Sequence, residues 1–218
     1  MDHPRRAAAR GRDALVTEFV GRVRAIAPYG RGVVPQEILE ADAHRTFDYL
    51  LRRIAGQPVP ERLLDIGPSI GRDRARRGVP LNDLLTAVRL DFRVLWAGLR
   101  ARAEPDDEPL LVSHVEDVWA AVEDYTTQIQ VSYRAEAALL ARERQGERTM
   151  LVAALLAGQD PDPDDVERVA VALDVDVDAD FLVAAAAATA GPALRRAADR
   201  LAPTAGWCTC SPPGGTSC

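Results

Sequence analysis

Apolar residues recur every three or four positions through much of the chain, a spacing that places them on one face of an α-helix. This pattern predicts a first helix over residues 13–27, closed by Pro28, and a second that opens at Pro35 and stops at Gly56. The apolar positions of these segments are Leu15, Val16, Phe19, Val20, Val23 and Ile26, and then Ile38, Leu39, Phe47, Leu50, Leu51 and Ile54.

Two further helices are predicted to meet at the corner RRGVP. The first of them, residues 60–77, is interrupted by Gly67 and Pro68, and we expect a kink or a restart there because proline lacks an amide donor and clashes with the preceding turn. Gly78 can adopt the left-handed cap conformation, and Pro80 sets the start of the next helix. The apolar stripe of that helix is Leu81, Leu84, Leu85, Val88, Phe92, Leu95, Trp96 and Leu99.

The longest predicted helix runs from Pro109 towards Gly158, with Gly146 as its candidate weak point. If unbroken, it extends on the order of 70 Å at 1.5 Å per residue, so part of it is expected to protrude from a small domain. Its apolar series alternates steps of three and four, as in a coiled-coil seam, which favours a dimerising helix that joins two modules. The series is Val115, Val118, Val122, Tyr125 and Ile129, and it resumes at Met150, Leu151, Leu155 and Leu156.

Beyond Gly158 the pattern changes to that of a partial α+β segment. Helices are predicted at VERVAVAL and GPALRRAADRLA, and strands at FLVAAAAA, GWCTCS and TSC, with PPGG as a turn. The chain ends with the third strand barely begun, so we expect a fragment or a truncated product of a longer protein. The predicted fold class is therefore mainly α, with a helical bundle, a long connecting helix and then this α+β segment.

Charge, hydropathy and cysteine content limit the classes of function that the chain can have. All 27 basic residues are arginine, and residues 1–150 balance 23 Arg against 23 acids, whereas residues 151–218 carry 4 against 10. This acidic surplus argues against nucleic-acid binding by the last third. No apolar run is long enough to span a bilayer and no signal peptide is evident, which predicts a cytoplasmic protein without membrane contact. Cys208, Cys210 and Cys218 lack the spacing of a zinc site and are interpreted as reduced thiols.

Two long phrases carry a resemblance to a known family. These are RARRGVPLNDLLTAVRLDFRVLWAGL at residues 74–99 and MLVAALLAGQDPDPDDVERVAVALDVDVDADFLVAAAA from Met150 onward. Together with the long helix they resemble bacterial transcriptional regulators of the PucR and CdaR type. Residues 12–145 are similar to the RsbT co-antagonist (RsbR-type) helical domain, and residues 150–218 to the start of a degenerate GGDEF-like domain. The resemblance implies signal input and homodimerisation, with DNA contact only through a C-terminal helix-turn-helix that this chain lacks.

An enzymatic role is the main rival interpretation. In active diguanylate cyclases, acidic residues of the signature hairpin bind metal and nucleotide, and PPGGTSC would be the corresponding hairpin here. Gly214 and Gly215 are present, but Thr216 and Ser217 stand where the acids should be, and neutral hydroxyls cannot hold Mg²⁺ beside a triphosphate. No serine triad, P-loop, dinucleotide fingerprint or metalloprotease helix occurs either. We therefore expect a protein that is not an enzyme, with no catalytic or metal-binding residues and no cofactor.

Four other groups could bind a ligand, and each has a simpler interpretation. The alternating acidic residues resemble a calcium-binding loop but lack its glycine and glutamate, and the two histidines lack an identifiable second metal or haem ligand. The aromatic residues lie on or next to apolar helix stripes, where they would fill the core. The arginines lie at a helix C-terminus, which favours positive charge. These groups are Asp174, Asp176, Asp178 and Asp180; His44 and His114; Phe92, Trp96, Trp119 and Tyr125; and Arg72, Arg74, Arg76 and Arg77. Two alternatives stay open: a sensory protein that binds haem or a metabolite, and a stressosome-like module that contacts other proteins.

Overall fold

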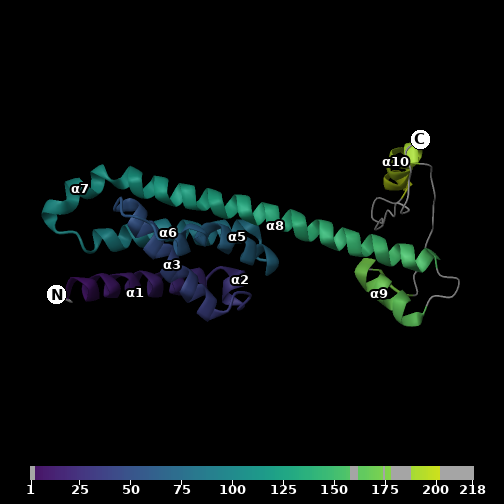
Figure 1. The fold of residues 1–218 in the computed structure, drawn as a ribbon, viewed down its shortest axis with the longest axis horizontal. Coiled ribbons are helices and arrows are strands. Elements are labelled where there is room, and N and C mark those ends of the chain that lie inside the picture. Colours follow the sequence, from purple (N-terminus) through teal and green to yellow (C-terminus); the bar gives the residue numbers. More distant parts are fainter. Residues whose placement is uncertain (1–2, 158–161, 174, 178–187, 202–218) are drawn as a thin grey trace. The chain divides into compact units, whose positions relative to one another are not determined.

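The computed structural model of the 218-residue chain describes residues 3–157, 162–173, 175–177 and 188–201 (Figure 1). These residues are almost entirely helical and contain no β-strand. They form two compact units, residues 1–140 and residues 141–218. The prediction of a mainly α protein is confirmed for the described ranges, within which no helix is long and apolar enough to cross a membrane.

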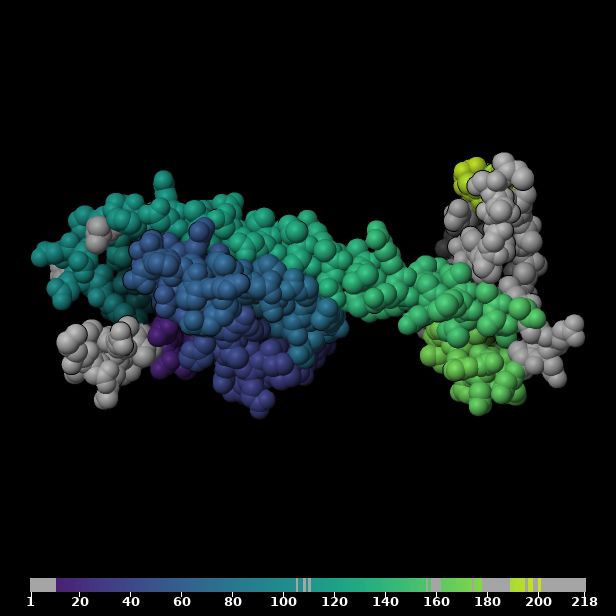
Figure 2. Space-filling view, viewed as in Figure 1, coloured from purple at the N-terminus to yellow at the C-terminus, as the bar shows by residue number. Residues whose placement is uncertain are grey.

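The first unit is a helical bundle. It contains α1 (His3–Val23), α2 (Ala27–Gly30), α3 (Gln36–Ile54), α4 (Glu61–Leu64), α5 (Ile66–Arg76), α6 (Leu81–Arg100), the 3₁₀ turn η1 (Pro105–Asp107), α7 (Glu108–Ser113) and the first part of α8 (Val115–Ala157). In Figure 1, α8 lies along the helices α5 and α6 of this bundle. In the space-filling view, the blue surface of the bundle meets the teal surface of α8 without a visible break (Figure 2).

Proline and glycine set the helix ends as predicted. Pro35 and Pro80 occupy the N-cap positions of α3 and α6, where the helix does not require the amide donor that proline lacks. Gly56 and Gly78 follow α3 and α5 with φ angles of 61° and 69°. These positive values place both glycines in the left-handed region that favours glycine at a helix end.

Three predicted helix boundaries were wrong. The break between α4 and α5 falls at Asp65, before the predicted interruption, and Pro68 lies in the first turn of α5, where proline is tolerated. Pro28 also begins a helix, since it lies in the first turn of α2 instead of closing α1. The predicted long helix is divided at His114, between α7 and α8, whereas Gly146 lies inside the 43-residue α8 and does not break it.

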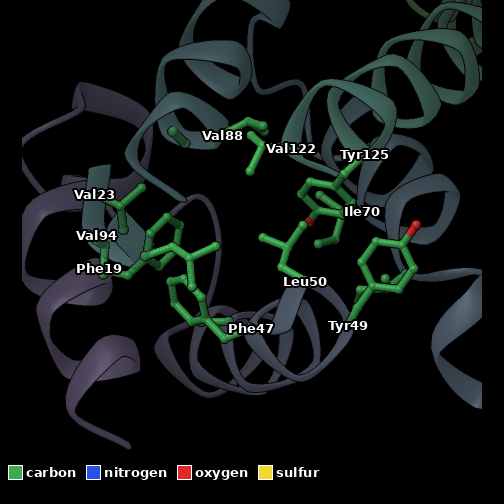
Figure 3. Close-up of a cluster of buried hydrophobic side chains, with 14 of the residues drawn as sticks. Phe19, Val23, Phe47, Tyr49, Leu50, Ile70, Val88, Val94, Val122 and Tyr125 are labelled. Atoms are coloured by element: carbon green, nitrogen blue, oxygen red, sulfur yellow. The ribbon is translucent and has the colours of Figure 1, made fainter. Parts of the chain in front are cut away.

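The predicted apolar stripes form one core in the first unit. Phe19 of α1 and Phe47 of α3 meet edge to face, with ring centroids 5.9 Å apart. Figure 3 shows these rings beside Val23 and Val94, and on the other side of the core Tyr125 directs its hydroxyl inward. Six of the largest fully buried side chains are Phe47, Leu50, Leu63, Ile66, Leu95 and Tyr125.

Part of the predicted coiled-coil seam of α8 lies inside this core, whereas Met150, where the series resumes, is 68% exposed. Val118, Val122, Tyr125 and Ile129 are each less than 7% exposed and pack against the other helices of the same chain. The seam interpretation was therefore wrong for this part of α8, because the periodicity that suits a partner helix equally suits the core of a bundle.

Two glycines let α5 approach α8 closely. A Cβ atom on Gly71 would lie 2.1 Å from Oγ of Ser132 and 2.5 Å from the carbonyl oxygen of Ile129. A Cβ on Gly67 would meet Cβ of Gln128 at 3.2 Å. The Gly-x-x-x-Gly spacing thus provides a flat face where the two helix backbones come together.

The described part of the second unit contains the end of α8, α9 (Pro163–Leu173) and α10 (Gly191–Leu201). The two helices predicted after Gly158 are confirmed by α9 and α10. Nε of Arg148 on α8 donates to the carbonyl oxygen of Ala172, which ties α9 to α8. The predicted strands at 206–211 and 216–218, and all but the last residue of the one at 181–188, lie outside the described residues.

Candidate functional site

A cluster of polar side chains lies in the core of the first unit. Thr46, Arg74 and Asp91 are 2%, 2% and 3% exposed, and the tyrosines Tyr29 and Tyr125 are 5% and 1% exposed. The five residues come from α3, α5, α6, α2 and α8 respectively, so five of the eight α-helices described in the bundle contribute. Buried polar groups destabilise a core unless each has a partner, so this cluster is the candidate functional site.

Arg74 is held by two carboxylates. Nη2 donates to Asp42 at 2.7 Å and Nη1 donates to Asp73, the preceding residue. Burial alone would lower the pKa of Arg74, but the charge of Asp42 and of its other neighbours raises it above the usual value. Among the residues that the structure describes, none accepts a hydrogen bond from the buried Nε of Arg74.

Asp73 connects this buried arginine to the surface. Besides Arg74, it accepts hydrogen bonds at 2.8 and 2.9 Å from Nε of Arg77, one helical turn later. Its partial burial raises the pKa of the carboxyl, yet the hydrogen bonds and charges of Arg77 and Arg74 outweigh this and lower the pKa below its usual value. Asp73 is therefore an ionised carboxylate that neutralises part of the buried arginine charge.

Asp91 on α6 is buried without a partner. In the part of the chain that the structure describes, its carboxyl group forms no ion pair and no hydrogen bond. Burial raises the pKa of Asp91 well above its usual value, because the charged form loses its hydration. The carboxyl group is thus biased towards the neutral form, in which it can donate as well as accept a hydrogen bond.

The two tyrosines remain protonated. Burial raises the pKa of Tyr29 to about 12, although the charge of Arg74 opposes the rise. Burial also raises the pKa of Tyr125 well above its usual value, and its hydroxyl lies 2.9 Å from Oγ of Thr46. The cluster therefore presents hydroxyl groups, a carboxyl group and a guanidinium group in one low-dielectric region.

A cavity of about 30 Å³ lies among these side chains. Its polar wall consists of Tyr29, Asp42, Thr46, Arg74, Asp91 and Tyr125. The remaining wall is apolar and includes the small residues Ala43 and Ala87. Ligand pockets for haem-sized or drug-sized molecules have volumes of roughly 300–1,000 Å³, so this cavity suits only something near the size of water.

Among the described residues, four side-chain hydrogen bonds link α8 to the rest of the bundle, and one of them runs from Arg53 of α3 to Asp124 at 3.1 Å. Besides the contact between Tyr125 and Thr46, the hydroxyl of Tyr133 donates to the carbonyl oxygen of Val79 at 2.8 Å. One turn further, Nε of Arg76 donates to Glu136 at 2.7 Å. These contacts connect α3, α5 and the segment before α6 directly to α8.

A second feature of the first unit is an open groove with aromatic walls. Phe92 and Trp96 of α6 stack with ring centroids 6.4 Å apart, and Phe92 also meets Trp119 of α8 edge to face at 5.3 Å. Trp119 is 57% exposed. Three arginines, Arg22, Arg93 and Arg100, line the groove with these α6 rings.

The candidate residues from the sequence differ in burial and in their contacts. Tyr125 is in the core as expected, but Trp119 is on the surface. Arg74 is buried in ion pairs, so the interpretation of its arginine group as a solvated helix end was wrong for this residue, while Arg72 does form an exposed pair with Asp65. His44 is half exposed, with Nδ1 3.9 Å from Asp13.

The other candidates include exposed or undescribed residues. His114 and Asp176 are exposed. The remaining acids of the alternating run, the cysteines and the hairpin lie outside the described residues: Asp174, Asp178 and Asp180; Cys208, Cys210 and Cys218; and Gly214, Gly215, Thr216 and Ser217. Among described residues, no group of three or more acids, histidines or cysteines is placed to hold a metal ion.

Sequence reasoning missed Asp91 and Thr46. Asp91 stands three residues after Val88 and four before Leu95, on the apolar stripe of α6. A carboxylate on such a stripe was the signal that could have identified it. Thr46, next to Phe47 on α3, carries no comparable signal because threonine is common on both faces of a helix.

Comparison with known families identifies the bundle. The family model for the RsbT co-antagonist protein rsbRD N-terminal domain matches residues 13–148, which is more than half of the chain. No curated protein and no solved structure gives a significant match. The expected RsbR-type helical domain is thus confirmed. The chain belongs to the family of RsbT co-antagonist protein rsbRD N-terminal domains.

Proposed function

We propose that this chain is the signal-input region of a cytoplasmic bacterial regulator that is not an enzyme. Family membership supports a regulatory input domain. The observation that carries the mechanism is the set of polar contacts from α3 and α5 to α8, with Tyr125 against Thr46 at its centre. An input that repacks the buried cluster changes these contacts, and α8 carries the difference to the segment that follows.

Hydrogen exchange tests this mechanism. Thr46→Val keeps the shape of the side chain but removes the partner of the Tyr125 hydroxyl. We expect faster amide exchange in α8 over residues 118–136, compared with the wild type. Thr86→Val, at an exposed position of α6 whose hydroxyl bonds only within its own helix, is the control. Unchanged exchange in α8 of a folded Thr46→Val protein would contradict the proposal.

At a finer level, we propose a regulator of the PucR or CdaR type, in which a GGDEF-like segment follows α8 and a DNA-binding domain lies further along a longer parent chain. The sequence resemblance of residues 150–218 supports this assignment. Reading the genomic DNA beyond codon 218 tests it. An open frame that encodes a helix-turn-helix supports the assignment, and a downstream frame of another class refutes it.

The proposed homodimer uses α8, but through the face that the bundle leaves open. Val131 and Leu139 are 64% and 48% exposed, and the small residue Ala135 lies between them on the same face. The first part of the seam that was expected to pair with a second copy, Val118 to Ile129, is already buried in the chain's own core. Two such faces could pack together with their apolar residues at the contact.

Analytical ultracentrifugation of Val131→Glu and Leu139→Glu tests the dimer. We expect both variants to be monomeric at micromolar concentrations where the wild type is dimeric. Thr86→Glu places the same charge on an exposed part of α6 and should leave the dimer intact. A monomeric wild type would refute the dimer without affecting the assignment as an input domain.

A second candidate function is a stressosome-like module that binds another protein. The groove lined by Phe92 and Trp96 favours it, together with the exposed Trp119 that packs against Phe92, because aromatic and arginine side chains are enriched where proteins bind one another. A pull-down from the native cell with the wild type and with Trp119→Ser tests this function. A kinase or phosphatase lost only from the variant would support it. The haem alternative receives no support from a cavity of about 30 Å³.

A further inference from the structure

Two buried polar groups of the core lack partners. In the described part of the chain, neither the Asp91 carboxyl group nor the buried Nε of Arg74 has a hydrogen-bond partner. Each group would destabilise the fold in a dry core, because it has lost its hydration without replacement. Both side chains line the same cavity, which suggests that one occupant serves both.

The cavity limits that occupant by size. A volume of about 30 Å³ exceeds the roughly 10–15 Å³ that a single water molecule requires, and it is far below what an organic ligand requires. A buried water also needs two to four polar partners. Besides Asp91 and Arg74, Tyr29 and Tyr125 also line the cavity, and each carries a hydroxyl group.

We propose that this cavity is a binding site for one or two water molecules, which link Asp91 to the tyrosine hydroxyls and give Nε of Arg74 an acceptor. The Arg74 Nε–H group and the neutral Asp91 carboxyl each donate to a water oxygen, and the water donates to a tyrosine oxygen. The site does not depend on the proposed regulatory function, since it follows from the core alone.

The cavity can be filled by enlarging either of two small side chains in its apolar wall. Ala87 is 4% exposed and Ala43 is 2% exposed, and both line the cavity. Ala87→Val adds two carbon atoms there without removing a polar group. Ala121 of α8 is similarly buried at 6% but does not line the cavity, so Ala121→Val is a matched control.

Magnetic relaxation dispersion of ¹⁷O-labelled water counts internal waters that exchange slowly with solvent. We expect the full-length wild type to retain one or two more of these waters than Ala87→Val, and Ala121→Val to retain as many as the wild type. We also expect a lower Tm for Ala87→Val than for Ala121→Val, because expelling water leaves Asp91 and Arg74 without partners.

Two outcomes would overturn the proposal. In the first, wild type and Ala87→Val retain the same number of internal waters and the variant has the higher Tm. This result would indicate that the cavity is dry and that the larger side chain fills it. If Ala87→Val does not fold, Ala43→Val provides the same comparison. The other is a Tm that depends on which of Na⁺, K⁺ or NH₄⁺ is present in the wild type but not in Asp91→Asn, which indicates a cation in place of water.

Discussion

The hydroxyl of Tyr125 on α8 lies 2.9 Å from the hydroxyl of Thr46 on α3, although the two residues are 79 positions apart. Replacing Tyr125 with Phe leaves the buried Thr46 hydroxyl without this partner. We expect a loss of about 1–3 kcal/mol in the free energy of unfolding, measured by urea denaturation. The double variant with Thr46→Val should lose less than the two single variants combined, because the pair interacts directly. Strictly additive losses would show that the hydrogen bond contributes nothing.

Asp91 gives the stability of the bundle a dependence on pH. Its pKa is raised in the folded state, so between the unfolded value of about 3.9 and the folded value the folded protein binds more protons. The contribution of Asp91 is therefore fully present below the unfolded pKa and is lost as pH rises through the folded pKa.

Asp91→Asn removes this titration while keeping the shape and the hydrogen-bonding capacity of the side chain. Urea denaturation of wild type and variant from pH 5 to pH 8 should show that the wild type becomes progressively less stable relative to the variant as pH rises. A constant difference over this range would mean that Asp91 does not titrate there. The reverse trend would mean that its pKa is lowered by folding.

Replacing a glycine with alanine should change stability in opposite directions at Gly71, where α5 meets α8, and at Gly21, which has open space around it. Gly71→Ala introduces a methyl group 2.1 Å from Oγ of Ser132 and 2.5 Å from a backbone oxygen, and it should destabilise the first unit by about 1–3 kcal/mol. Gly21→Ala on α1 meets nothing within 4 Å and should stabilise the helix, by up to about 1 kcal/mol. Similar effects of the two substitutions on Tm would contradict the predicted close packing.

Two arginines that are close in sequence, Arg74 and Arg72, should differ in their effect on stability because only Arg74 is buried. Arg74→Met leaves Asp42 and Asp73 without their buried cation and should destabilise the fold by about 3 kcal/mol. Arg72→Met breaks only an exposed pair with Asp65, which is worth about 0–1 kcal/mol. Chemical denaturation of both variants provides the comparison. Equal losses would show that Arg74 is not specifically required in the core.

Much of the fold could be predicted because its determinants are local. Pro35, Pro80 and Gly78 act through their own backbone conformations, and their effects on α3, α5 and α6 appear as predicted. The spacing of apolar residues also identified most of the core. It could not show whether the stripe of α8 meets its own bundle or a second copy, since both surfaces require the same periodicity.

The candidate site was harder to predict because it depends on contacts between distant segments. Arg74 lies among four arginines at a helix end, and only its pairing with Asp42, 32 positions earlier, distinguishes it from the exposed Arg72. Asp91 interrupts an apolar stripe, which is a local signal of burial. Its neighbours from other helices around the cavity belong to α1, α2, α3, α5 and α8, and no spacing within α6 indicates them.

The boundary between the two units falls at Leu140 and Ala141, inside the continuous helix α8. Residues 141–147, just after it, are all exposed. Since each residue of an α-helix advances about 100°, one residue inserted in this stretch turns the following residues of α8 by that angle about the helix axis, without altering the sequence of the core. Seven inserted residues restore the original facing to within about 20°. Angular phase along α8 is thus a variable that evolution or an engineer can change independently of the stability of the bundle.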